Sequence, residues 1–98
     1  MFVNKYLRLT EKTSEEDLKK KMRDIYDNND HVRLIIDTTD SNMSMKGADK
    51  IKSVFDGFEK ETEEKLKDVF IIVKGDVAKT ILGAFVNNLK NKKPVKII

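Results

Sequence analysis

Three aspartates are the residues in this 98-residue chain whose spacing could support chemistry. Asp37 ends one apolar run, Asp40 follows three residues later, and Asp76 comes just after a second apolar run. If both runs are parallel strands, the three carboxylates lie at the edge where open α/β sheets place their sites, and they could hold Mg²⁺. In the competing interpretation, which we favour, they serve turns and a helix N-cap.

Other catalytic patterns are incomplete. Residues 75–80 begin with Gly and contain a Lys, but the spacing is too short for a phosphate loop and the second Gly is missing. His31, the single histidine, follows a polar turn, where we expect a solvent-facing side chain. The chain has no Cys, which excludes disulfides and thiolate chemistry. We therefore expect no enzyme activity, no metal and no cofactor.

The elements that would position these residues are organised around residues 69–89. Residues 69–73 predict a buried strand, Gly75 a strained turn and Asp76 a helix N-cap. Residues 94–98 predict a further strand, since Pro is tolerated at a strand start. The helix between them would turn one apolar face inward, formed by Val77, Ala78, Ile81, Leu82, Phe85 and Leu89.

The first two thirds of the chain predict two more strands and two more helices. Strands are expected over 2–9 and 31–37. A capping box at 13–16 predicts a helix that ends in the polar turn 27–30. A second helix is expected from about Gly47 and would extend through the charged run 59–67 to about Lys65. Their inward residues would be Leu18, Met22, Ile25 and Tyr26, then Ile51, Val54, Phe55 and Phe58.

This order, β-α-β-α-β-α-β, predicts one α/β domain over 1–98 with a four-stranded, mostly parallel sheet. With right-handed crossovers throughout, the helices lie mainly on one face of the sheet. Strand alternation then leaves a mixed apolar and basic surface on the other face, formed by Tyr6, Arg8, Arg33, Ile35, Phe70, Ile72, Lys74 and Lys96. We hypothesise that it contacts a partner. Alternatively, the N-terminus, the charged run 59–67 or a twin subunit covers it.

Composition narrows the partner classes. Hydrophobic residues are 39% and charged residues 38%, and the net charge is only +3 because acids nearly balance the lysines. That balance argues against nucleic acid as a partner. No window approaches the roughly 18 apolar residues of a membrane span. Asn4 and Lys5 follow the first apolar residues at once, so we expect no signal peptide and a cytoplasmic protein.

Several segments together resemble a known group. Residues 9–11 with 16–18, then 31–37, then 69–73 are similar to the STAS, or anti-sigma-factor-antagonist-like, superfamily. Residues 69–98, with the lone Pro94, resemble compact CRAL-TRIO-like proteins, some of them viral. The resemblance implies a right-handed βα superhelix with sequential strands. It also implies a phosphorylatable serine before the second helix, where this chain has Ser41 and Ser44 in a different turn. We favour N-capping for both serines.

Two functional classes follow. The first is a non-enzymatic, STAS-like protein-interaction or regulatory module, with a protein partner or self-association as a homodimer. The second is a small CRAL-TRIO-like protein that binds a lipid, a hydrophobic ligand or a membrane surface. A chain of 98 residues leaves little room for an enclosed pocket of several hundred Å³. We therefore expect the interaction module.

Overall fold

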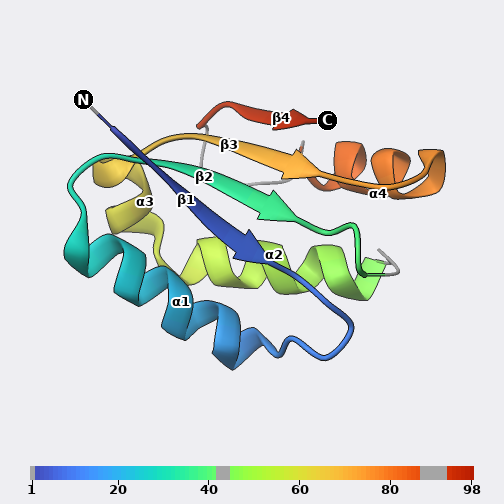
Figure 1. Cartoon of the computed structure of the whole chain (residues 1–98), viewed down its shortest axis with the longest axis horizontal. Coiled ribbons are helices and arrows are strands. Elements are labelled where there is room, and N and C mark those ends of the chain that lie inside the picture. Colours follow the sequence, from blue (N-terminus) through green and yellow to red (C-terminus); the bar gives the residue numbers. More distant parts are fainter. Residues whose placement is uncertain (1, 42–44, 87–92) are drawn as a thin grey trace.

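The computed structural model describes residues 2–41, 45–86 and 93–98 and shows an α/β fold. Its sheet contains four strands, all parallel, in the spatial order in which they occur along the chain (Figure 1). The strands are β1 (Val3–Arg8), β2 (Val32–Asp37), β3 (Leu66–Ile72) and β4 (Val95–Ile97). The helices in the described residues are α1 (Glu15–Asn28), α2 (Met45–Gly57), α3 (Glu59–Lys65) and α4 (Asp76–Val86).

The hydrophobic core lies between the helices and one face of the sheet, which we call the inner face. The strands contribute alternate residues to it, among them Leu7, Leu34 and Ile71. Helices α1, α2 and α4 contribute their buried sides to the same cluster, which includes Leu18, Met22, Ile51, Val54, Ala78 and Leu82. Burial of apolar area is the main stabilising force in such a layer. The predicted helix covering of a single sheet face therefore agrees with the packing.

Helix α1 begins as its sequence predicts. Ser14 is the N-cap, and its hydroxyl accepts a hydrogen bond of 3.1 Å from the backbone N–H of Asp17. The first turn carries Glu15, Glu16 and Asp17, whose charges favour the positive end of the helix dipole. All four predicted inward residues, Leu18, Met22, Ile25 and Tyr26, are buried.

The turn before α4 is also confirmed, but one inward residue is wrong. Gly75 has φ +94°, a conformation that glycine adopts at little cost, and α4 begins at the next residue. Ala78 and Leu82 are buried as expected, whereas Val77 is 74% exposed because it lies in the first turn, beside Asp76 and away from the core. The side chain of Phe85 and all of Leu89 lie outside the described residues.

The predicted single helix from about Gly47 to Lys65 is interrupted. The chain leaves helical geometry at Phe58 (φ −124°, ψ 37°) and resumes as the separate helix α3. The side chain of Phe58 is buried and meets the ring of Tyr26 edge-on, with 5.9 Å between ring centroids. We attribute the break to this anchor, because it turns α3 back towards the start of β3. The order is therefore β-α-β-α-α-β-α-β.

Strand β3 starts three residues before the expected Val69, inside the charged run. Val32 pairs with Leu66 and Arg33 pairs with Asp68, so Lys67 is an extra residue in the ladder. This irregularity is a β-bulge. As a result Leu66 and Val69 are both buried on the inner face, while Lys67 is exposed and Asp68 is half-buried.

We predict that Tyr26 makes the protein lose stability as the pH rises from 10 to 12. Burial raises the pKa of Tyr26 to about 12, and its hydroxyl lies 2.9 Å from that of Thr62. An unfolded chain releases this proton near pH 10, so the folded state binds more protons between pH 10 and 12 and stability falls across that window. The two-unit difference corresponds to about 2–3 kcal/mol.

Chemical denaturation at pH 9 and pH 12 measures this loss. Tyr26→Phe is the control. It removes the hydrogen bond to Thr62, at a cost of about 1 kcal/mol near pH 8. Lysines also lose their charge over this range, but they do so in both proteins. If wild type loses no more unfolding free energy between pH 9 and pH 12 than Tyr26→Phe, the raised pKa of Tyr26 is contradicted.

Candidate functional site

The face of the sheet opposite the core, which we call the outer face, is the candidate site. It presents three rows of side chains, one at each level of the parallel ladder. The rows are Asn4, Arg33 and Asp68; then Tyr6, Ile35, Phe70 and Lys96; then Arg8, Asp37 and Ile72. Among the described residues no helix packs on these side chains (Figure 1).

The middle row, together with Ile72 from the next row, carries most of the exposed apolar surface. Tyr6 is 71% exposed, and Phe70 and Ile72 are only half-buried. Ile35 is only 9% exposed, because its neighbours in the sheet cover it. It is not part of the core cluster. Parallel sheets normally have both faces covered. A half-buried aromatic and aliphatic row on a parallel sheet is therefore a surface that a partner could cover.

Arg33 is fixed in the centre of a cluster at the amino ends of the strands. Its Nε and one terminal nitrogen donate to the two carboxylate oxygens of Asp68, at 2.8 Å and 3.0 Å. The guanidinium carbon lies 4.6 Å from the ring centroid of Phe2 and 4.8 Å from that of Phe70. The two-point hydrogen bond to Asp68 raises the pKa of Arg33. The guanidinium thus bridges two aromatic rings and a carboxylate.

The β-bulge in β3 makes this cluster possible. It directs Lys67 and Asp68 outward in succession, so that Asp68 lies opposite Arg33. The ammonium of Lys67 then lies 3.7 Å from the ring centroid of Phe2. Phe2 is therefore held between two cations, although it precedes the first strand. Bulges commonly re-aim side chains next to functional sites.

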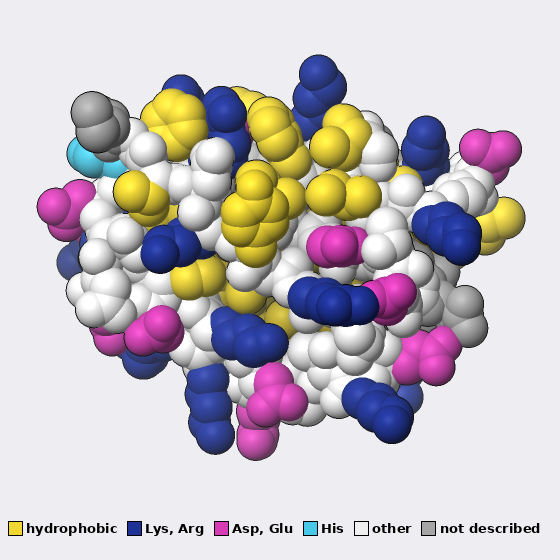
Figure 2. Space-filling model, in the orientation of Figure 1, with side chains coloured by type: hydrophobic (Ala, Val, Ile, Leu, Met, Phe, Trp, Pro, Cys, Tyr) yellow, Lys and Arg dark blue, Asp and Glu magenta, His cyan; other side chains and the backbone are white. Residues whose placement is uncertain are grey.

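The charges around the apolar row are mostly positive. Figure 2 shows hydrophobic side chains gathered over the strands, with Lys and Arg side chains among them. Arg8 forms an ion pair with Asp40, and Arg33 forms one with Asp68. The remaining cations are Lys67, Lys74 and Lys96, all exposed. With acids largely paired, the outer face has a basic surplus that favours an acidic partner.

The metal site suggested by the three aspartates does not form within the described ranges. The carboxylate of Asp37 accepts from the backbone N–H and the hydroxyl of Thr39, at 2.9 Å and 2.7 Å, and these bonds lower its pKa. Asp40 pairs with Arg8, and Asp76 begins α4. No group of three or more metal-ligating side chains occurs in residues 2–41, 45–86 and 93–98. Asp37 thus makes the loop hydrogen bonds that the favoured interpretation expects, while the N-cap role of Asp76 stays a prediction.

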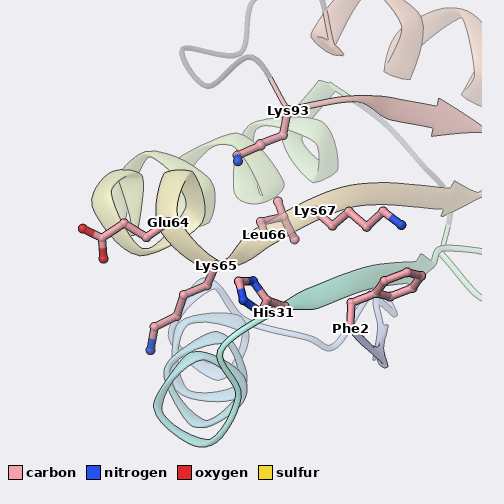
Figure 3. Close-up of a pocket in the computed structure, with 7 residues that line it drawn as sticks. All are labelled: Phe2, His31, Glu64, Lys65, Leu66, Lys67 and Lys93. Atoms are coloured by element: carbon pink, nitrogen blue, oxygen red, sulfur yellow. The ribbon is translucent and has the colours of Figure 1, made fainter.

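A hollow of about 410 Å³ opens at the amino ends of the strands, beside the Arg33 cluster. It is lined by Phe2, His31, Glu64, Lys65, Leu66, Lys67 and Lys93 (Figure 3). The charged ends of Glu64 and Lys65 point away from His31 and Leu66, and the ammonium of Lys65 donates to the backbone carbonyl of Tyr26. Among the described residues, no hydrogen bond is found that orients the side chain of His31. The hollow extends the apolar and basic character of the outer face.

Of the two serines, Ser41 is described and Ser44 lies outside the described residues. The backbone N–H of Ser41 donates to the carbonyl of Thr38 at 3.0 Å. Ser41 lines a hollow of about 270 Å³ near the start of α2, together with Lys46 and Lys50. A phosphate on Ser41 would therefore face cations. Modification of either serine stays a prediction.

All eight residues predicted for the partner surface lie on the outer face or at its border, and this face also includes residues that the sequence did not single out. Ile98 is 48% exposed, and its backbone pairs with β3 beyond the end of β4. Strand alternation alone could have added Ile98 and Phe2. It could also have added Asp68, which shares the parity of Phe70 and Ile72, but not Lys67, whose outward placement depends on the bulge.

Comparisons with protein families, curated proteins and solved structures found no match to this chain. None of the helices in the described ranges combines the length and the apolar character needed to cross a membrane.

We predict that Asp68→Asn loosens Arg33 without unfolding the chain. The amide has one acceptor oxygen and no charge, so the two-point hydrogen bond is lost while the side-chain volume is kept. NMR exchange of the Arg33 Nε proton with water should become faster. Asp56→Asn is the matched control, since it breaks the ion pair with Lys52 on α2. Equal Arg33 exchange in both variants would contradict the bridging role of Asp68.

Proposed function

We propose that this chain is a non-enzymatic protein-interaction module whose outer face binds an acidic segment of another protein. The observation that carries the proposal is the group of exposed or half-buried apolar side chains of Tyr6, Phe70 and Ile72, with lysines beside them. Apolar and aromatic side chains supply the buried centre of an interface, and charges at the rim select the partner. The expected partner segment therefore carries Asp or Glu around one or two apolar side chains.

The rigid centre of the face supports this proposal. Arg33 is held by Asp68 and by two rings, so it loses little conformational freedom when a partner binds. Arginine and aromatic residues are also the types that most often dominate binding energy in protein interfaces. Lys96 lies directly beside Phe70 in the ladder and extends the row with a positive charge.

We also propose a STAS-like topology, as the sequence resemblance implies. The sequential strand order, the parallel pairing and the core on one sheet face support it. Right-handed crossovers complete it, since nearly all parallel β-α-β connections have that hand. In this proposal the outer face, rather than the turn with Ser41, is the principal docking surface.

The competing lipid-binding function has less support. Three hollows lined by described residues have charged side chains in their walls and are open to solvent. A hydrophobic ligand needs an enclosed, mostly apolar cavity. The outer face could still contact an anionic membrane surface through its lysines and apolar row. We treat that contact as an outcome of the test below.

Selection of peptides from a random displayed library tests the proposal. We expect the selected peptides to be rich in Asp or Glu with aromatic or aliphatic anchors, and to shift NMR signals of Tyr6, Phe70 and Lys96. Tyr6→Ala should weaken binding of a selected peptide about tenfold, as is typical for an exposed aromatic anchor. Lys96→Glu should weaken it by a similar factor and reduce its salt dependence.

Two matched controls fix the location. Val77→Ala removes an equally exposed apolar side chain from α4, and Lys20→Glu reverses an exposed charge on α1. Both should leave peptide affinity unchanged. Peptides without acids, or equal losses in the control variants, would refute the proposal. Binding to phosphatidylserine vesicles that Tyr6→Ala and Lys96→Glu abolish, with no peptide selected, would replace it with membrane-surface binding.

A further inference from the structure

Strand β1 is an edge strand, and one row of its backbone groups points away from the sheet. The N–H of Val3 donates to the carbonyl of His31 at 3.0 Å, and that of Leu9 donates to Asp37 at 2.8 Å. Odd-numbered residues of β1 therefore direct their backbone polar groups towards β2. Asn4, Tyr6 and Arg8 direct theirs to the open side, because successive residues alternate. In the part of the chain that the structure describes, no hydrogen bond reaches the backbone of these three residues.

The two edges of the sheet differ in their protection. β4 has three residues and follows Pro94, and short strands and proline both discourage pairing with another chain. β1 has six residues, without proline or a bulge. Val3 and Tyr6, both on β1, are two of the large hydrophobic side chains that are exposed. Lys5 and Arg8 are the charges on this edge, and Asp40 pairs with Arg8.

We propose that β1 pairs antiparallel with β1 of a second copy of this chain, with Tyr6 opposite Tyr6. A twofold axis perpendicular to the sheet joins two identical edges and keeps side chains of one parity on the same face. The residues whose backbone groups point to the open edge must also lie opposite each other, so that they can exchange hydrogen bonds. Only a few registers satisfy both the symmetry and this hydrogen-bonding condition.

Charge and length select among these registers. A register centred on Lys5 places the two lysines directly opposite each other, which is unfavourable. A register centred on Asn4 pairs little more than the first half of the strand. The register centred on Tyr6 pairs the strand along its length, with Lys5 opposite Leu7 and Asn4 opposite Arg8. It places no like charges opposite each other, and it brings the two exposed tyrosine rings side by side on the outer face.

This pairing goes beyond the proposed function, and it leaves most of the outer face open. The two sheets become continuous, and both outer faces lie on the same side. The apolar and basic rows of the two copies then adjoin at Tyr6. A partner with two acidic segments could therefore engage both copies at once. An acidic strand from a different protein is the competing occupant of the edge.

Single-cysteine variants test the register, because the natural chain has no Cys. In the Tyr6 register the two Cα atoms of residue 6 lie about 5.5 Å apart, within the range of about 4.4–6.8 Å that a disulfide needs. The two Cα atoms of residue 4 are more than about 10 Å apart along the strands. Under mild oxidation Tyr6→Cys should form a covalent dimer and Asn4→Cys should stay monomeric. Failure of Tyr6→Cys to cross-link, or equal cross-linking of Asn4→Cys, would overturn the proposal.

Sedimentation equilibrium of the unmodified chain gives a second test. Wild type should associate to a dimer, and Tyr6→Pro should be monomeric, since proline removes an N–H directed to the open edge and breaks no bond to β2. Circular dichroism checks that Tyr6→Pro remains folded. Val77→Ala should dimerise like wild type. A wild type that stays monomeric up to millimolar concentration overturns self-pairing, whether or not the outer face binds acidic peptides.

Discussion

The structure depends on one constraint: the strands bury alternate residues against helices on a single side. Leu34 and Ile71 illustrate it, since both are fully buried while their chain neighbours Arg33, Phe70 and Ile72 are turned the other way. Within the described residues, the helices cover only one face of the four-stranded sheet. The core and the outer face are therefore two consequences of the same alternation.

Local sequence signals predicted the elements where each signal acts over a few residues. The cap at Ser14, the turn at Gly75 and the alternation of β2 are of this kind. The failures involve distant contacts. The break at Phe58 depends on the ring of Tyr26 from another helix, and the early start of β3 depends on Arg33 in the neighbouring strand. Periodicity within the run 59–67 carries no trace of either contact.

The candidate site also combines features that local sequence predicts with features that depend on distant contacts. The alternation of side chains along the strands was enough to place Tyr6, Phe70 and Ile72 on one surface. Parity also puts Phe2, Arg33 and Asp68 on that surface. It does not give the register between strands, on which the contacts of Arg33 with Phe2, Phe70 and Asp68 depend. The aspartates near the carboxyl ends of the strands are a separate case, for which a shared metal site was the less favoured interpretation. Their spacing suggested a shared ligand, but Thr39 and Arg8 are nearer partners for two of them.

The sequential strand order also affects how the chain reaches this fold. Each strand pairs with the strand before or after it in the chain, so no pairing requires closure of more than one crossover. Loop-closure entropy and contact order are therefore low for a parallel sheet. The fold can grow by adding one strand and its helix at a time to a β1–α1–β2 nucleus. Assembly should accordingly be quicker than in sheets whose first and last strands meet at the centre.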